Sequence, residues 1–223
     1  MSTEIDSVID ALAREVDPLR SALIIIDVQP DFMPGGALAC EQGDAVIAPI
    51  RQLLDRGLFK HVVATQDWHP EGHISFASQH PGHAPFEEID LYGHPQTLWP
   101  PHCIANTPGA MLHPAIDWQA VSLILRKGNN PKVDGYSAFR HNIDMQGQRP
   151  TSGLAAWLHS LNVERVYLCG LARDVCVQWS AEDAVDAGFD TTVLWEMTRP
   201  VTSAHDNDVL SAFQAKGIRT LMS

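Results

Sequence analysis

The stretch SALIIIDVQ (residues 21–29) is a run of branched apolar side chains that ends in polar ones. Such a run is typical of a strand that is buried on both faces of a parallel sheet. The chain holds five more strand-like segments, at residues 61–67, 121–128, 164–171, 191–197 and 218–222. We therefore expect a sheet of six strands.

Helix-like segments lie between these strands, at residues 44–57, 151–161, 174–187 and 203–216. The first of them begins at Asp44 and ends at Gly57, residue types that favour a helix start and a helix end. Strands that alternate with helices predict an α/β fold, with a parallel, doubly wound sheet and helices on both faces. A chain of 223 residues fits one such domain over residues 1–223, of which residues 1–20 form an N-terminal extension or helix.

Composition narrows the class of protein. The chain has 15 basic and 27 acidic residues, a formal net charge of −12, which argues against nucleic acid or an anionic membrane as a partner. The first ten residues carry acids and no base, unlike a targeting signal, and the aliphatic stretch 22–26 is too short to span a bilayer. The four cysteines do not suggest a disulfide framework. We expect a reduced, cytoplasmic protein.

Two long connections, residues 68–120 and 129–150, interrupt the α/β pattern. Eight of the 11 histidines lie between His61 and His113, most of them in the first connection. Loops of this length are uncommon in a compact domain and usually carry function. In open α/β sheets, ligands bind beyond the carboxyl ends of the strands, where such loops emerge. We therefore expect the functional residues at this edge of the sheet.

The first long loop has candidate metal ligands at both of its ends. Asp67 and His69 are two residues apart at a strand end, so an extended backbone sends both side chains to the same side. His73 follows closely, and His102 lies at the far end of the loop, directly after two prolines. One carboxylate with two or three imidazoles suits a divalent first-row ion that keeps positions open for water or substrate. Spacing alone leaves the alternative that these are solvated loop histidines.

Cys176 is a candidate nucleophile. It ends the stretch GLARDVC (residues 170–176), between a strand and the helix expected at 174–187. A thiol in the first turn of a helix has a lowered pKa, and free backbone N–H groups in such a turn can form an oxyanion hole. The alternative is a buried, inert cysteine on the apolar face of the helix.

Asp27 and Lys127 each end an apolar strand. An ionised carboxylate in such a place needs a charged partner or a shifted pKa. At neighbouring strand ends, Asp27, Lys127 and Cys176 would supply a base, a positive stabiliser and a nucleophile. The alternative is a structural ion pair between Asp27 and Lys127.

Six motifs occur in order along the chain: IIIDVQPDF (24–32) followed by GGAL (35–38), TQDWHP with HISF (65–76), LWPPHC (98–103), RKG (126–128), GYSAF (135–139) and GLARDVC (170–176). Together they resemble the nicotinamidase branch of the isochorismatase-like cysteine hydrolases, over residues 21–222. The resemblance implies a three-layer α/β/α sandwich with a six-stranded, mainly parallel, Rossmann-like sheet.

By position, the catalytic Asp–Lys–Cys triad of this family falls on Asp27, Lys127 and Cys176. Its oxyanion hole falls on the N–H groups of Ala172 and Cys176, and its cis peptide bond precedes Ala172. The apolar and aromatic positions that line the substrate pocket fall on Phe32, Trp99 and Tyr136.

The metal ligands of the family fall on Asp67, His69 and His102. His73 matches a position that ligates the metal in some members and is only nearby in others. The resemblance implies one divalent ion, zinc in the first place, with iron or manganese as alternatives.

The activity that the resemblance implies is metal-dependent hydrolysis of nicotinamide to nicotinate and ammonia through a thioester on Cys176, a step of NAD salvage, with pyrazinamide as a second substrate. The implied partner is a small molecule, and it remains open whether the chain forms a homo-oligomer. Three rival interpretations remain. The chain could be another amidohydrolase of the superfamily, an amidase that activates water with its metal while Cys176 is a bystander, or a metal-binding module without catalysis.

Overall fold

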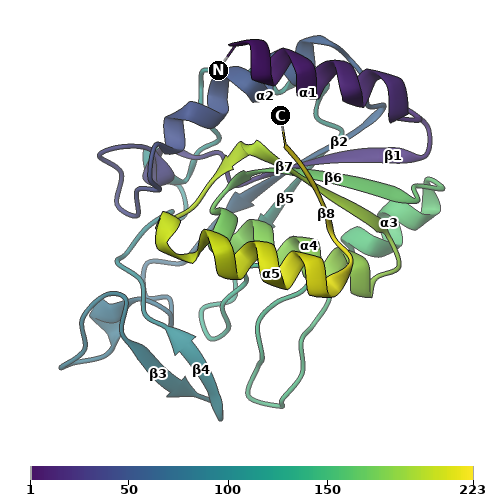
Figure 1. Cartoon of the computed structure of the whole chain (residues 1–223). Helices are drawn as coiled ribbons and strands as arrows, with labels where there is room; N and C mark the ends of the chain where they lie inside the picture. The colour runs from purple at the N-terminus through teal and green to yellow at the C-terminus, as the bar shows by residue number, and fades with distance from the viewer. Residues whose placement is uncertain (1, 223) are drawn as a thin grey trace.

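The computed structural model describes residues 2–222 and has a central six-stranded sheet (Figure 1). The strand order is β5-β2-β1-β6-β7-β8, and every neighbouring pair is parallel. The strands are β1 (Ser21–Ile26), β2 (His61–Asp67), β5 (Leu123–Lys127), β6 (Arg165–Leu171), β7 (Asp190–Arg199) and β8 (Arg219–Leu221). The six-stranded parallel sheet expected from the sequence is confirmed.

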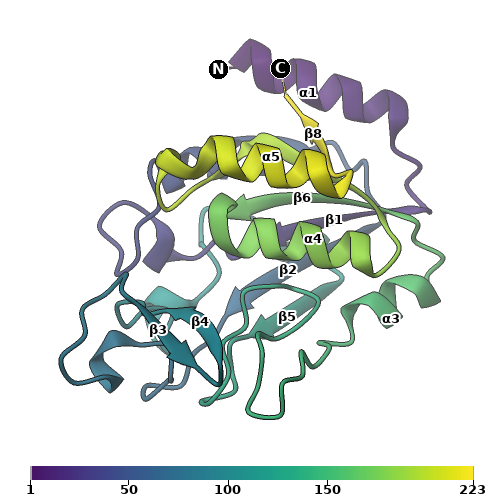
Figure 2. The same ribbon diagram turned by 60° about the horizontal axis from the view of Figure 1, so that its bottom comes forward.

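Helices cover both faces of the sheet, as Figures 1 and 2 show from two sides. One face carries α1 (Ser2–Glu15) and α2 (Ile47–Asp55), and the other carries α3 (Leu154–Ser160), α4 (Gln178–Asp186) and α5 (Asp206–Lys216). The fully buried side chains of β1 alternate between the two cores, with Leu23 and Ile25 on the α1 side and Ile24 and Ile26 on the other. The three-layer sandwich is therefore confirmed. Among residues 2–222, no helix combines the length and the apolar character needed to cross a membrane.

The structure departs from the expected helices near the N-terminus. The sequence left open whether residues 1–20 form an extension or a helix, and the structure shows that they contain α1. One face of this helix is buried against the sheet and consists of Ile5, Val8, Ile9 and Leu12. The helix expected at residues 44–57 begins with a 3₁₀ turn (Gly43–Val46) before α2. Pro49 explains the late start, because a residue without an N–H group fits only the first turn of an α-helix.

The first long loop contains a β-hairpin that the sequence did not predict. Its strands, β3 (Glu88–Leu91) and β4 (His94–Thr97), are antiparallel and lie apart from the main sheet (Figure 1). Tyr92 and Gly93 connect them, and both have positive φ angles (59° and 83°), as a two-residue type I′ turn requires.

The strand order reverses between β1 and β6, because the chain adds β2 and β5 on one side of β1 and then β6, β7 and β8 on the other. In open α/β sheets, the crevice beyond the carboxyl ends of the strands at such a reversal is the usual ligand site. The segments that follow β1, β2, β5 and β6 all emerge at this end of the sheet.

Candidate active site

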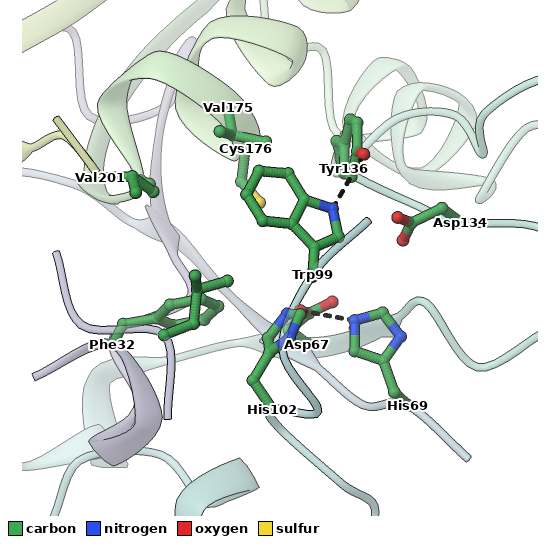
Figure 3. Close-up of a pocket in the computed structure, with 12 residues that line it drawn as sticks. Phe32, Asp67, His69, Trp99, His102, Asp134, Tyr136, Val175, Cys176 and Val201 are labelled. Carbon is green, nitrogen blue, oxygen red and sulfur yellow. Dashed lines mark hydrogen bonds and ion pairs between the residues drawn. The ribbon is translucent and has the colours of Figure 1, made fainter. Parts of the chain in front are cut away.

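A pocket opens at this end of the sheet (Figure 3). The three residues expected to line a substrate pocket, Phe32, Trp99 and Tyr136, all lie in its wall. The indole N–H of Trp99 donates a hydrogen bond to the hydroxyl of Tyr136 (3.0 Å), and the two rings meet edge to face. Three apolar side chains of the same wall were not predicted from the sequence: Leu38, Val175 and Val201.

Lys127 lies at the centre of the predicted triad. Its Nζ is 2.8 Å from Asp27 Oδ2, 3.0 Å from Asp67 Oδ1 and 3.4 Å from Cys176 Sγ. All four side chains are buried. The structure thus brings together Asp27 from the end of β1, Lys127 from the end of β5 and Cys176 from the turn after β6, as the sequence predicted.

Thr65 orients the carboxylate of Asp27. Its hydroxyl donates to Asp27 Oδ1 (2.6 Å) and accepts from the N–H of Asp27 (3.0 Å). Thr65 was not predicted as a site residue, although it is a polar residue inside the apolar strand HVVATQD (residues 61–67). Its partner could not be read from the sequence, because it depends on how β1 and β2 align.

The expectation of a lowered thiol pKa at Cys176 is wrong. Cys176 lies in a π-helical turn (Arg173–Val177) that precedes α4, and it is buried. Burial raises the pKa of the thiol well above its ordinary value, the charge of Lys127 opposes this, and the carboxylates of Asp27 and Asp67 add to it. The thiol therefore holds its proton near neutral pH and needs a base to remove it.

The carboxyl of Asp27 is suited to that task. Burial raises its pKa, and the nearby charge of Asp67 acts in the same direction, while Lys127 and Thr65 lower it. By contrast, burial would lower the pKa of Lys127, but Asp27 and Asp67 outweigh it and raise this pKa well above the ordinary value. The ammonium group therefore stays charged between the two carboxyl groups.

The turn that carries Cys176 also carries Ala172. The peptide bond between Leu171 and Ala172 is cis, as the resemblance implied. The carbonyl of Ala172 accepts hydrogen bonds from the N–H groups of Val175 (3.1 Å) and Val177 (2.9 Å), which fixes the shape of the turn. Ala172 and Cys176, the two residues expected to form an oxyanion hole, therefore border the pocket from one turn.

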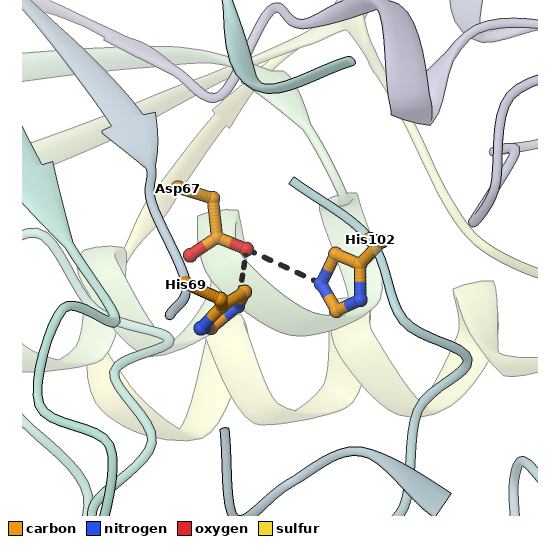
Figure 4. Close-up of side chains that lie close together, drawn as sticks. All are labelled: Asp67, His69 and His102. Carbon is orange, nitrogen blue, oxygen red and sulfur yellow. Dashed lines mark hydrogen bonds and ion pairs between the residues drawn. The ribbon is translucent and has the colours of Figure 1, made fainter. Parts of the chain in front are cut away.

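Asp67, His69 and His102 form a buried cluster beside the triad (Figure 4). Oδ2 of Asp67 lies 2.9 Å from Nε2 of His69 and 3.3 Å from Nε2 of His102. Two distant segments of the long loop meet here, because the N–H of His69 donates to the carbonyl of Cys103 (2.9 Å) and the N–H of Ala105 donates to the carbonyl of His69 (2.8 Å).

The donor atoms of this cluster fit a cation. Nδ1 of His69 lies 2.9 Å from the carbonyl of Gly128, and Nδ1 of His102 lies 2.8 Å from the carbonyl of Pro100. A carbonyl only accepts, so each Nδ1 donates its proton there, which leaves the Nε2 atoms of both rings as the nitrogens that face Asp67. Histidine ligands of metals are oriented by such outer hydrogen bonds. Three electron-pair donors that converge in a buried place suit a divalent ion.

The local charge also favours a cation. Burial would lower the pKa of His69, but the carboxylate of Asp67 outweighs it and raises this pKa. Burial would likewise raise the pKa of Asp67, yet His69 and Lys127 hold it well below its ordinary value. Gly128 makes room for the His69 ring, since it has a φ of +67° and a Cβ there would lie 2.5 Å from His69 Cε1.

His73 does not join this cluster. Its Nδ1 lies 2.7 Å from Ser75 Oγ and its Nε2 lies 3.3 Å from the carbonyl of Val133. Among the described residues, it groups instead with His69 and with Asp134. Asp134 is a further pocket-lining residue that the sequence analysis missed, and its only signal was an acidic residue directly before GYSAF.

Comparisons with known proteins agree with this geometry. The family model described as the isochorismatase domain matches residues 21–220. The curated nicotinamidase of Acinetobacter baylyi is 46% identical over 181 residues, which cover 81% of this chain and 81% of that protein.

Three solved structures have the same fold. A nicotinamidase/pyrazinamidase of Acinetobacter baumanii has a TM-score of 0.86 and 40% identity, and the match covers 92% of this chain and 97% of that one. PnC1 from L. infantum in complex with nicotinate has a TM-score of 0.80 and 35% identity, with 93% and 94% covered. The pyrazinamidase of Pyrococcus horikoshii in complex with zinc has a TM-score of 0.72 and 33% identity, with 92% and 99% covered.

These matches confirm the resemblance that the six motifs indicated. The family model spans almost the whole sheet, from the first residue of β1 to the last strand. This chain belongs to the isochorismatase family.

Proposed function

We propose that the chain is a nicotinamidase, which hydrolyses nicotinamide to nicotinate and ammonia through a thioester on Cys176. One observation carries the proposal: Lys127 bridges Asp27, Asp67 and Cys176 at a pocket that also borders the Asp67–His69–His102 cluster. The names of the relatives agree with it, and so does the nicotinate complex of the L. infantum structure.

The triad can move the proton that this reaction requires. Asp27 and Cys176 both lie against Lys127 Nζ, at 2.8 and 3.4 Å, so the Asp27 carboxylate is placed to take the thiol proton as the sulfur attacks the amide carbon. The charge of Lys127, 3.4 Å from the sulfur, stabilises the thiolate. Asp27 then gives the proton to the departing ammonia, and water hydrolyses the thioester to release nicotinate.

Backbone N–H groups of the turn after β6 complete the chemistry. Ala172 and Cys176 would donate to the oxyanion that forms on the amide oxygen, a contribution of about 2.7–4 kcal/mol for each donor in comparable enzymes. Phe32, Trp99 and Tyr136 provide apolar and aromatic walls for a flat ring.

Asp67, His69 and His102 would hold one divalent ion, and the zinc complex of the Pyrococcus horikoshii relative favours zinc over iron or manganese. Such an ion supplies a positive centre that fixes the ring nitrogen of the substrate, a gain in positioning. His73 stays outside this set. We further infer a single catalytic domain over residues 1–223 that includes the N-terminal helix, and a place in NAD salvage. We also infer a cytoplasmic location, because all four cysteines are free.

The direct test is ammonia release from nicotinamide by the purified, reduced protein. We expect release that falls at least about tenfold after treatment with a chelator and returns when Zn²⁺ is added back. Absence of ammonia from the Zn²⁺-reconstituted, reduced protein would contradict the proposal.

Pyrazinamide is expected to be hydrolysed as well, because it keeps a ring nitrogen at the same distance from the carboxamide as nicotinamide. Benzamide, which has the same size and no ring nitrogen, is the matched control. We expect its kcat/KM to be about 10²-fold lower, because without a ring nitrogen the amide carbon is not held in the orientation that the thiolate attacks. Equal rates on all three amides would show that the metal cluster does not position the ring.

A further inference from the structure

The loop after β1 carries two polar side chains that the proposed mechanism does not use. Gln29 is fully buried and Asp31 is half-buried, and they lie between Asp27 and Phe32. Both side chains reach backbone atoms of the segments that hold the metal-ligand cluster.

Gln29 binds both backbone groups of Asp67. Its Oε1 accepts the N–H of Asp67 (2.7 Å), and its Nε2 donates to the carbonyls of Asp67 (2.8 Å) and Ala110 (2.9 Å). Only this orientation of the amide satisfies all three partners. The pairing of β1 with β2 ends at Ile25 and Ala64, so beyond this point the Gln29 amide supplies the hydrogen bonds that a neighbouring strand would make to Asp67. The backbone of Asp67 is thereby held by Gln29 on the β1 side and by strand pairing with Lys127 on the β5 side.

Asp31 holds the segment that carries His102. Its Oδ2 accepts the N–H of Cys103 at 2.7 Å, and Cys103 has a φ of +45°, an uncommon conformation for a residue other than glycine. The carboxylate is seated against Gly109, where a Cβ would lie 2.3 Å from both oxygens. Only glycine therefore leaves space for this contact.

We propose that Gln29 and Asp31 are positioning residues of the metal site, with Gln29 fixing the Asp67 side and Asp31 fixing the His102 side. The inference rests on the proposed function, since it takes Asp67, His69 and His102 as the metal ligands. It also links the metal site to the base, because Asp27, Gln29 and Asp31 belong to one short loop.

The test is the Zn²⁺ affinity of the purified full chain without substrate, measured by competition with a chromophoric chelator. Gln29→Met and Asp31→Ala are expected to bind Zn²⁺ about 10–100-fold more weakly, the usual cost of losing a residue that orients metal ligands. Asp31→Asn keeps an oxygen that can accept the Cys103 N–H, so we expect an affinity within about threefold of the unmodified chain. If Gln29→Met does not fold, Gln29→Glu replaces it, since Glu cannot donate to the Asp67 carbonyl and should weaken Zn²⁺ binding to the same extent.

Gln66→Met is the matched control. Gln66 is buried next to Asp67 and donates to the same Ala110 carbonyl (2.8 Å), while its Oε1 accepts from Arg126 Nε (3.2 Å). It makes no side-chain hydrogen bond to the three metal ligands among the described residues. We expect its Tm to fall while its Zn²⁺ affinity stays within about threefold.

A second measurement separates positioning from loss of stability. At saturating Zn²⁺ we expect Gln29→Met and Asp31→Ala to recover most of their ammonia release, whereas at limiting Zn²⁺ they should lose it. Unchanged Zn²⁺ affinity in both variants, or an equal loss in Gln66→Met, would overturn the inference. A chain that binds Zn²⁺ but releases no ammonia would overturn the proposed function alone, and the affinities would still decide the roles of Gln29 and Asp31.

Discussion

Cys176→Ala is expected to lower ammonia release from nicotinamide by about 10⁴-fold or more, while the variant still binds its metal. The loss is large because the proposed reaction proceeds through a bond to this sulfur, and a nucleophile and its base act as one unit. Metal binding should persist because the thiol is not part of the group that could hold the ion, which consists of Asp67, His69 and His102. Ammonia release and bound zinc are measured on the same preparation.

Two variants serve as controls for this result. Cys169→Ala removes another free, buried thiol, which lies in β6 away from the pocket, and it should cost stability while activity stays within about threefold. Asp67→Ala should show the converse pattern, with loss of zinc and an intact Cys176. Substantial turnover by Cys176→Ala would instead favour an amidase that attacks with a metal-activated water.

Three side chains of the candidate site could be predicted because they follow the ends of parallel strands. Asp27, Asp67 and Lys127 each come directly after an apolar run, and the carboxyl ends of parallel strands share one edge of the sheet. Register then decides which of them touch, and β2 and β5 are aligned with Asp67 opposite Lys127. The proximity of Asp27, Asp67 and Lys127 could thus be predicted from the pattern of the strands, whereas the hydrogen bonds of Thr65 and Gln29 could not.

The errors of the sequence analysis have physical causes. The thiol pKa of Cys176 was expected to be lowered by a helix end, but the depth of burial, which only the folded chain shows, has the larger effect. The hairpin β3–β4 was missed because its strands are short and mostly polar and one of them contains Pro95. The role of His73, by contrast, was left open, and in the structure its nitrogens face Ser75 and Val133.

Lys127→Met is expected to lower the free energy of unfolding of the metal-free protein by about 3–5 kcal/mol at neutral pH, because it leaves two buried carboxyl groups without their cation. Without that cation, the pKa of Asp27 in the folded state should rise further above its unfolded value. A group of this kind binds a proton on folding, so the deficit of the variant should shrink as the pH falls from neutral toward the ordinary range of a carboxyl. Urea unfolding at several pH values measures it.

Lys216→Met is the matched control, since Lys216 pairs with Asp186 on the surface, and its loss should cost less than about 1 kcal/mol at any of these pH values. Ammonia release separates the two roles that Lys127 could have. If Lys127 stabilises the thiolate, Lys127→Met loses activity even under conditions where it is fully folded, about 10²-fold or more. If the Asp27–Lys127 pair only supports the fold, the folded variant keeps its activity, and the proposed role of Lys127 in the reaction would be wrong.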